Sequence, residues 1–337
     1  MAGDKEAFMD LVFETVSEKT PGEKWQSLFE TLWPAYQRWF LSDGIEARQT
    51  YLAGYRALKE YMPELVPAYE KLCELAGGDD LSARFLSFYC PPAYLSGCSQ
   101  AVWPGHEPML VRNYDYAPAL CDGLILHSRW HDRWVMGMSD GLFGLVDGLN
   151  DRGLAVSLTF GGRTVVGDGF GVPIILRYIM EFCDTVADAT EALTRIPSHM
   201  TYNVTVVDKQ GRHATVYLAP DRDAIVTDQR VATNHQERVE WHRHARATAT
   251  VERERFLLQR LTLHDEPADR FIGAFQKPPL YSTAFARGFG TLYTAIYWPR
   301  KGLAEYRWPG VHWTQRLKAP VEGRRHIRFP MSDEALA

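Results

Sequence analysis

Apolar side chains in the first ninety residues recur at steps of three and four, which is the spacing of one face of an α-helix. The longest stripe consists of Trp25, Leu28, Phe29, Leu32, Trp33, Tyr36, Trp39 and Phe40. The same spacing continues over residues 51–58 and 65–73. We therefore predict a helical, aromatic-rich first segment, and we expect its stripe to pack against another part of the chain.

Start and stop signals bound these helices. The run Thr20–Glu23 (Thr-Pro-Gly-Glu) predicts that Thr20 is an N-cap in a capping box. Asp79 or Asp80 is expected to cap a further short helix. The two prolines at 91–92 then end the helical pattern, because a residue before proline favours extended backbone.

From Cys98 onward the pattern changes to short apolar runs with glycine at the bends, which is typical of strands. The predicted strands cover 101–103, 109–111, 123–130, 135–138, 142–149, 154–160, 202–207, 214–218, 291–298 and 303–308. The predicted helices cover 173–182, 186–196 (capped by Asp184 or Thr185) and a long polar stretch, 238–263. Strands and helices occur in separate runs, which favours an α+β fold over a βαβ repeat.

Composition narrows the function classes. The chain has 337 residues with 37 Lys and Arg against 42 Asp and Glu, a net charge of −5, so nucleic-acid binding is not expected. Five cysteines without a CxxC pair favour neither a zinc ribbon nor a redox pair. The N-terminus has no signal-peptide pattern and no apolar run is long enough for a membrane span. We expect a cytoplasmic protein without contact to membranes.

The candidate chemistry centres on one cysteine. Gly97 and Cys98 precede a short apolar strand that ends in the run Arg112–Asp115 (Arg-Asn-Tyr-Asp). Three further motifs follow in order: 147–155 (DGLNDRGLA), 171–173 (GVP) and 233–235 (TNH). Together these motifs resemble the cysteine-type N-terminal-nucleophile (Ntn) hydrolases, in the branch of the acyl-coenzyme A:6-aminopenicillanate acyltransferases, which is related to the bile-salt hydrolases.

This resemblance implies a fold and a maturation step. The fold would be a four-layer αββα Ntn sandwich over residues 98–337, preceded by a helical leader over residues 1–97. The bond between Gly97 and Cys98 would be cut by the chain itself, and the leader would remain bound as the smaller partner of a heterodimer. The freed α-amine of Cys98, which titrates near ~7.7–8.0, would then act as the base for its own thiol.

The resemblance also implies an activity. The thiol would form a thioester from a linear amide, so the substrate is a small N-acyl amine, and neither a cofactor nor a metal is expected. Water would resolve the thioester in a hydrolase, and an amine would resolve it in a transferase, with acyl-coenzyme A as a further possible partner. The sequence leaves hydrolase and transferase open. The aromatic residues Trp103, Tyr114, Tyr116 and Phe160 suggest an aromatic acyl pocket.

The remaining site residues follow from matched positions. Asp115 would hold the α-amine, Arg112 matches the arginine of the bile-salt hydrolases, and Asn234 would donate to the oxyanion. Arg287 matches a family arginine with a one-residue shift in spacing. Thr159 or a backbone N–H would supply the second oxyanion donor, where some relatives have an asparagine.

The residues taken alone leave other interpretations open. Arg112 and Asp115 should alternate to opposite faces of their strand, unless it ends or bulges near Tyr114, and a surface salt bridge would explain them equally well. Asn234 is equally compatible with an ordinary turn. A second hypothesis is an uncleaved, non-catalytic protein that serves as a binding or structural module. A metal-dependent amidohydrolase would need clustered ligands, and His127 and His131 lie on a predicted strand where they cannot share a metal.

Overall fold

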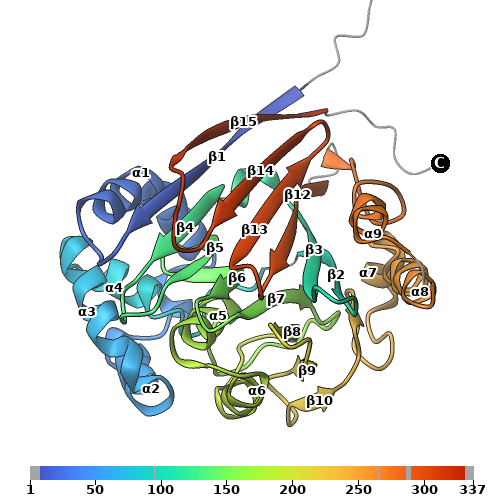
Figure 1. Cartoon of the computed structure of the whole chain (residues 1–337). Coiled ribbons are helices and arrows are strands. Elements are labelled where there is room, and N and C mark those ends of the chain that lie inside the picture. Colours follow the sequence, from blue (N-terminus) through green and yellow to red (C-terminus); the bar gives the residue numbers. More distant parts are fainter. Residues whose placement is uncertain (1–7, 95, 264–265, 286–289, 331–337) are drawn as a thin grey trace, which may run out of the picture.

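Two β-sheets face each other in the computed structural model, which describes residues 8–94, 96–263, 266–285 and 290–330 (Figure 1). The larger sheet has nine strands, in the spatial order β10 (Ile225–Thr227), β9 (His213–Leu218), β8 (Tyr202–Asp208), β7 (Leu154–Phe160), β6 (Gly144–Asn150), β5 (Val135–Asp140), β4 (Leu124–Ser128), β1 (Phe8–Glu18) and β15 (Gly323–Pro330). The smaller sheet has six, in the order β11 (Val231–Ala232), β2 (Gly97–Trp103), β3 (Met109–Tyr116), β12 (Gly290–Trp298), β13 (Leu303–Trp308) and β14 (Val311–Arg316).

Helices pack on the outside of the two sheets, so the α+β prediction is confirmed. The leader contributes α1 (Glu23–Phe40), α2 (Tyr51–Tyr61), α3 (Val66–Leu75) and α4 (Asp80–Leu86), and α5 (Val172–Phe182) and α6 (Val186–Arg195) pack on the larger sheet. The smaller sheet is covered by α8 (Thr250–Leu261), which follows α7 (His242–Ala247), and by α9 (Ala268–Ala274). No helix in the described part of the chain is long and apolar enough to cross a bilayer.

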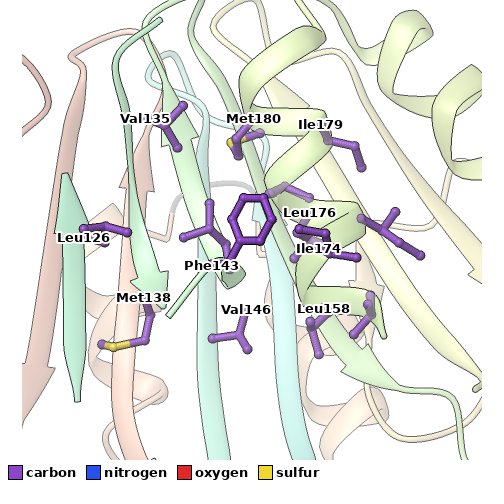
Figure 2. Packing of buried hydrophobic residues seen from close by; sticks show 14 of the residues in the cluster. Leu126, Val135, Met138, Phe143, Val146, Leu158, Ile174, Leu176, Ile179 and Met180 are labelled. Carbon is purple, nitrogen blue, oxygen red and sulfur yellow. The ribbon is translucent and has the colours of Figure 1, made fainter. Parts of the chain in front are cut away.

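One layer of the main apolar core lies between α5 and the larger sheet. Figure 2 shows Ile174, Leu176, Ile179 and Met180 of α5 among side chains of that sheet, with Phe143 between them. These side chains are almost completely buried. Burying one aliphatic or aromatic side chain of this size contributes about 1.5–3 kcal/mol, so this layer fixes the sheet that forms one wall of the site.

The first segment is not entirely helical, which corrects the sequence prediction. Residues 8–18 form β1, which lies within the larger sheet, antiparallel to β15 and parallel to β4. Phe13 of β1 is fully buried and packs against Tyr293 and Trp308 of the facing sheet. The leader is therefore joined to the larger sheet by backbone hydrogen bonds as well as by its helices.

The first helix begins later than its capping signal predicts. Its N-cap is Gly22, and Thr20 forms no capping box. Instead, the Glu18 carboxylate at the end of β1 accepts hydrogen bonds from the backbone N–H groups of Lys24 (3.0 Å) and Trp25 (3.1 Å). A carboxylate from the preceding strand thus satisfies the free donors of the helix N-terminus. The caps Asp79 and Thr185 are confirmed, the second within a capping box.

The long helix predicted over 238–263 is wrong. The chain forms two shorter helices, α7 and α8, separated at Ala249, which has a left-handed backbone with φ +46°. Directly after this break, the Thr250 hydroxyl accepts a hydrogen bond from Asn234 N (2.7 Å) and donates one to Thr233 Oγ1 (2.8 Å). These tertiary contacts override the local helix preference. Strands β1, β10, β11, β14 and β15 and helix α9 were not predicted.

Candidate active site

Cys98 is the second residue of β2, and strand alternation decides which way it faces. Cys98 pairs with Tyr114 and Gln100 with Arg112 across the β2–β3 ladder. The Gln100 side chain donates to Thr205 Oγ1 of the larger sheet (2.8 Å), so this face of β2 points into the space between the sheets. The Cys98 thiol lies on the same face and has no exposed surface.

Arg112 is in direct contact with this thiol. Its Nη2 lies 3.1 Å from Cys98 Sγ, and its guanidinium lies 4.8 Å from the centre of the Tyr114 ring. The other end of the guanidinium is held by the larger sheet, because Nη1 donates to Val146 O (2.6 Å) and Asp147 Oδ2 (2.9 Å). Arg112 and Asp147 are both fully buried, so removing either would leave an unpaired charge in the interior.

Burial sets the protonation state of the thiol. Desolvation raises the pKa of Cys98 above its usual value, and the positive charge of Arg112 only partly opposes this effect. The thiol of the intact chain therefore carries its proton at neutral pH. It becomes a strong nucleophile only when a base removes that proton, because the thiolate is the reactive form.

Asn234 is bonded to both sides of the Gly97–Cys98 junction. Its Oδ1 accepts a hydrogen bond from Cys98 N (3.1 Å), and its Nδ2 donates to Ser96 O and Phe160 O (3.3 Å each). The amide thus spans the backbone from Ser96 to Cys98, and its Nδ2 already has two carbonyl acceptors in the intact chain. A side-chain amide beside a scissile bond can donate to a tetrahedral oxyanion, and this role of Asn234 stays a prediction.

Asp115 lies on the opposite face of β3 from Arg112, as strand alternation predicts. Its carboxylate accepts a hydrogen bond from Thr291 Oγ1 (2.7 Å), and burial raises its pKa despite the positive charge of Arg253 at 3.6 Å. The irregularity near Tyr114 lies in β12, between Thr291 and Tyr293, while the β2–β3 pairing stays in register. In the intact chain Cys98 N–H is bound by Asn234, so the role of Asp115 towards the freed amine stays a prediction.

Arg253 of α8 is the buried residue that sequence reasoning missed. Its Nη1 donates to Cys98 O (2.6 Å) and Ser99 Oγ (2.8 Å), and its Nη2 donates to Asn234 Oδ1 (2.6 Å). It therefore joins β2 to the Asn234 loop. A signal was present, because Thr250, Arg253 and Leu257 fall at spacings of three and four and share the buried face of α8.

Thr159 holds the Asn234 loop in place. Its hydroxyl donates to Thr233 O (2.6 Å) and accepts a hydrogen bond from Asn203 Nδ2 (3.0 Å), so its proton is already committed. Phe160 packs edge-to-face against His244, near the site. Arg287 lies outside the described residues.

Of the aromatic residues expected around the site, Phe160 lies on the larger sheet, and the others divide between the two faces of the smaller sheet. Trp103 packs against Phe271 on the α8–α9 side, away from Cys98, so it is not part of an acyl pocket. Tyr116 lies next to Tyr114 (ring centres 5.6 Å apart) on the side of the nucleophile. No cluster of three or more potential metal ligands occurs among the residues that the structure describes.

Comparison with known proteins gives one family and several solved structures. A family model described as "Acyl-coenzyme A:6-aminopenicillanic acid acyl-transferase" matches residues 103–313. Penicillin V acylase from Agrobacterium tumefaciens is similar in structure, with 13% identity, 66% of this chain and 86% of that chain covered, and a TM-score of 0.49. No curated protein sequence matches the chain.

Two further solved structures are similar over comparable lengths. A mutant of conjugated bile acid hydrolase from Clostridium perfringens has 14% identity, covers 70% of this chain and 98% of its own, and gives a TM-score of 0.38. The Caenorhabditis elegans ortholog of N-acylethanolamine-hydrolyzing acid amidase has 15% sequence identity and a TM-score of 0.42. The match covers 60% of this chain and 93% of that chain.

Proposed function

Because the chain belongs to the acyl-coenzyme A:6-aminopenicillanic acid acyl-transferase family, we propose that Cys98 is the nucleophile of an enzyme that cleaves or transfers acyl groups at linear amides. The family match covers Arg112, Asp115 and Asn234 but begins five residues after Cys98. The observation that carries the proposal is therefore geometric. The Cys98 sulfur is in contact with the Arg112 guanidinium, and the Cys98 backbone N–H donates a hydrogen bond to the Asn234 side chain.

The first step in this proposal is cleavage of the chain. Cys98 Sγ attacks the carbonyl carbon of Gly97, the carbon–nitrogen bond breaks, and the Cys98 nitrogen takes up the thiol proton. The resulting thioester is hydrolysed by water, which gives a carboxylate on Gly97 and returns a proton to the sulfur. Two pieces of 97 and 240 residues result, the second being 337 less 97.

Turnover repeats this chemistry on an external amide. The α-amine of Cys98 accepts the thiol proton and passes it to the leaving amine, while Asn234 Nδ2 donates to the oxyanion. Arg112 stabilises the developing thiolate through its contact with Sγ. Water then releases the acid and regenerates the thiol, or a second amine takes the acyl group.

A non-catalytic role for the intact chain is the second candidate, and the burial of Cys98 favours it. The thiol has no exposed surface and lies against Ser96, 3.8 Å from its hydroxyl. In the enzyme hypothesis this cover is removed when cleavage frees the segment that ends at Gly97. In the alternative it remains permanently, and the protein serves as a binding or structural module.

The experiment that separates the two candidates uses the purified wild-type protein. Its intact mass is measured under denaturing conditions, and a panel of N-acyl amines with aliphatic and aromatic acyl groups is tested for amine release. The enzyme hypothesis expects two fragments that meet at Gly97 and Cys98, together with amine release. A single unbroken species that releases no amine from any compound supports the non-catalytic role.

The rate of self-cleavage is expected to increase with pH. Because burial holds the pKa of the Cys98 thiol above its usual value, the thiolate fraction should rise about tenfold per pH unit between about pH 7 and 9. The chain can be made by cell-free synthesis, transferred to buffers across this range, and followed on denaturing gels. A rate that does not depend on pH would show that the thiol is already ionised in the precursor.

A further inference from the structure

An aromatic pocket lies between the leader helices and the larger sheet. Its cavity volume is about 100 Å³, which is less than the roughly 300–1,000 Å³ of sites for drug-sized ligands, so it would hold only a small organic group. Its lining includes Tyr36 and Trp39 of α1, Phe85 of α4, and Tyr94 and Tyr116. The described residues of this lining are mostly apolar or aromatic, as expected of a site that buries the body of an organic ligand.

Two carboxyl groups face this pocket without a basic partner. The Tyr36 hydroxyl donates a hydrogen bond to Asp122 Oδ1, lies 3.4 Å from Asp140 Oδ1, and accepts one from Gly141 N (2.8 Å). Asp122 Oδ2 is buried and has no hydrogen-bond partner. None of the described lining residues is Lys, Arg or His.

The absence of a cation here contrasts with buried carboxyls elsewhere in the described chain. Asp147 is paired with Arg112, Asp115 faces Arg253, and Glu181 is paired with Arg177. A buried carboxylate without such a partner is costly, and the cost falls when a cation is supplied. The site around Asp122 therefore has the surroundings of a charge pair in which the positive member is missing.

The lining of the pocket packs against aromatic residues that lie next to the nucleophile. Tyr116, which lines it, lies 5.6 Å from Tyr114 between ring centres, and Tyr114 is the residue paired with Cys98. Tyr94, which also lines it, lies 6.4 Å from Tyr116 and 6.3 Å from Tyr202 between ring centres. A row of aromatic rings thus connects the carboxyl pair with the region of the thiol.

We propose that this pocket binds a protonated amine or guanidinium carried on an apolar or aromatic body, with Asp122 and Tyr36 receiving the cation. Given the proposed function, on which this second part rests, the cation is the end of the substrate remote from the amide that Cys98 attacks. The enzyme would then select N-acyl amines with a positively charged end over neutral ones of the same shape.

Affinity for such a cation is expected to rise with pH below the pKa of the ligand. Burial raises the pKa of both Asp122 and Asp140. The negative charge of Asp140 raises the pKa of Asp122 further. The other titratable groups that face the pair are tyrosines 36, 94 and 116 and Cys121, which are neutral near pH 7. Raising the pH therefore removes a proton from the pair and strengthens its attraction for the ligand.

The binding part is tested with the purified full chain and two probes of equal shape, phenethylamine and phenethyl alcohol, by isothermal titration calorimetry. At about pH 8.5, above the pKa of about 8 to which burial raises Asp122, wild type is expected to bind the amine about tenfold or more tightly than the alcohol, because a charge-assisted hydrogen bond to a buried carboxylate discriminates by at least that factor. The Asp122→Asn variant should lose this preference. The Asp132→Asn variant, which changes a fully surface-exposed carboxylate (side chain 97% exposed), should keep it.

Asparagine resembles the protonated form of Asp122, so Asp122→Asn is expected to unfold at a temperature no lower than wild type at neutral pH. The wild-type comparison of amine and alcohol does not depend on any variant. Equal affinity for both probes in wild type, or an unchanged amine preference in folded Asp122→Asn, would overturn the proposal.

The substrate part is tested with N-acyl compounds that end in either an amine or a hydroxyl group. The charged compound should show a KM about tenfold lower in wild type, with similar kcat, and the difference should disappear in Asp122→Asn. Equal KM values would show that the cation site is not part of substrate recognition. Amine binding without hydrolysis of any compound would instead contradict the proposed function and leave the binding site standing.

Discussion

Replacing Cys98 with alanine is expected to leave one unbroken chain and to lower amide hydrolysis by at least about 10³-fold. The reason is that in the proposed mechanism one sulfur serves both reactions: it would attack Gly97 in the precursor and the substrate carbonyl afterwards. Alanine keeps the buried volume nearly filled and the backbone N–H that Asn234 binds, so the fold should persist. Intact mass and amine release measure the two effects on the same preparation.

A serine at this position is the matched control. Cys98→Ser retains a nucleophile next to Arg112 Nη2, but a hydroxyl is far less ionised than a thiol, so cleavage should be slowed rather than abolished. Hydrolysis by Cys98→Ala at the wild-type rate would contradict the assignment of the site. Loss of folding in both variants, seen by circular dichroism, would show that the residue is mainly structural.

Replacing Arg253 with methionine is expected to lower the free energy of unfolding by about 3–5 kcal/mol. Methionine is of similar length but leaves the Asp115 carboxylate buried without its cation, and it removes donors from Cys98 O and Asn234 Oδ1. The change is measured by urea unfolding in a Cys98→Ala background, so that every variant is a single unbroken chain. The protein that carries Arg253→Met alone, with Cys98 retained, should also cleave itself much more slowly than wild type.

The matched control lies two residues along the same helix. Arg255 is exposed, so Arg255→Met should change stability little. Adding Asp115→Asn to Arg253→Met should recover part of the lost stability, since it removes the unpaired charge. A free energy of unfolding that is the same for Arg253→Met and Arg255→Met would show that the buried contacts of Arg253 contribute nothing net.

The sequence predicted those elements whose local pattern and tertiary role agree. Strands 154–160 and 303–308 were predicted with the observed bounds, because the first is a largely apolar run, the second alternates in burial, and turn residues bound both. The helix predicted over 238–263 failed because Thr250 forms long-range hydrogen bonds that no local pattern encodes. Strand β1 was missed because its exposed polar positions and its pairing with the last strand become apparent only in the folded sheet.

The residues of the candidate site likewise fall into those that the sequence indicated and those that it did not. Motif resemblance pointed to Cys98, Arg112 and Asn234, and the structure brings these three into contact. Their catalytic roles stay predictions. The partner of Arg112, Asp147, was part of a recognised motif, but its contact with Arg112 joins two different sheets and cannot be read from spacing. Arg253 was not singled out, because burial of an arginine depends on distant acceptors such as Cys98 O.

If the chain is cut between Gly97 and Cys98 as proposed, the position of β1 decides whether the two pieces stay together. This strand is held between β15, through eight paired residues, and β4, through five, and both neighbours belong to the larger piece. Separation of the pieces would require opening a sheet in its interior, so they should travel together through purification. Once denatured, however, the small piece would have to re-enter by a bimolecular insertion, so we expect renaturation of the cut protein to be slow, dependent on concentration and far less complete than that of the uncut chain.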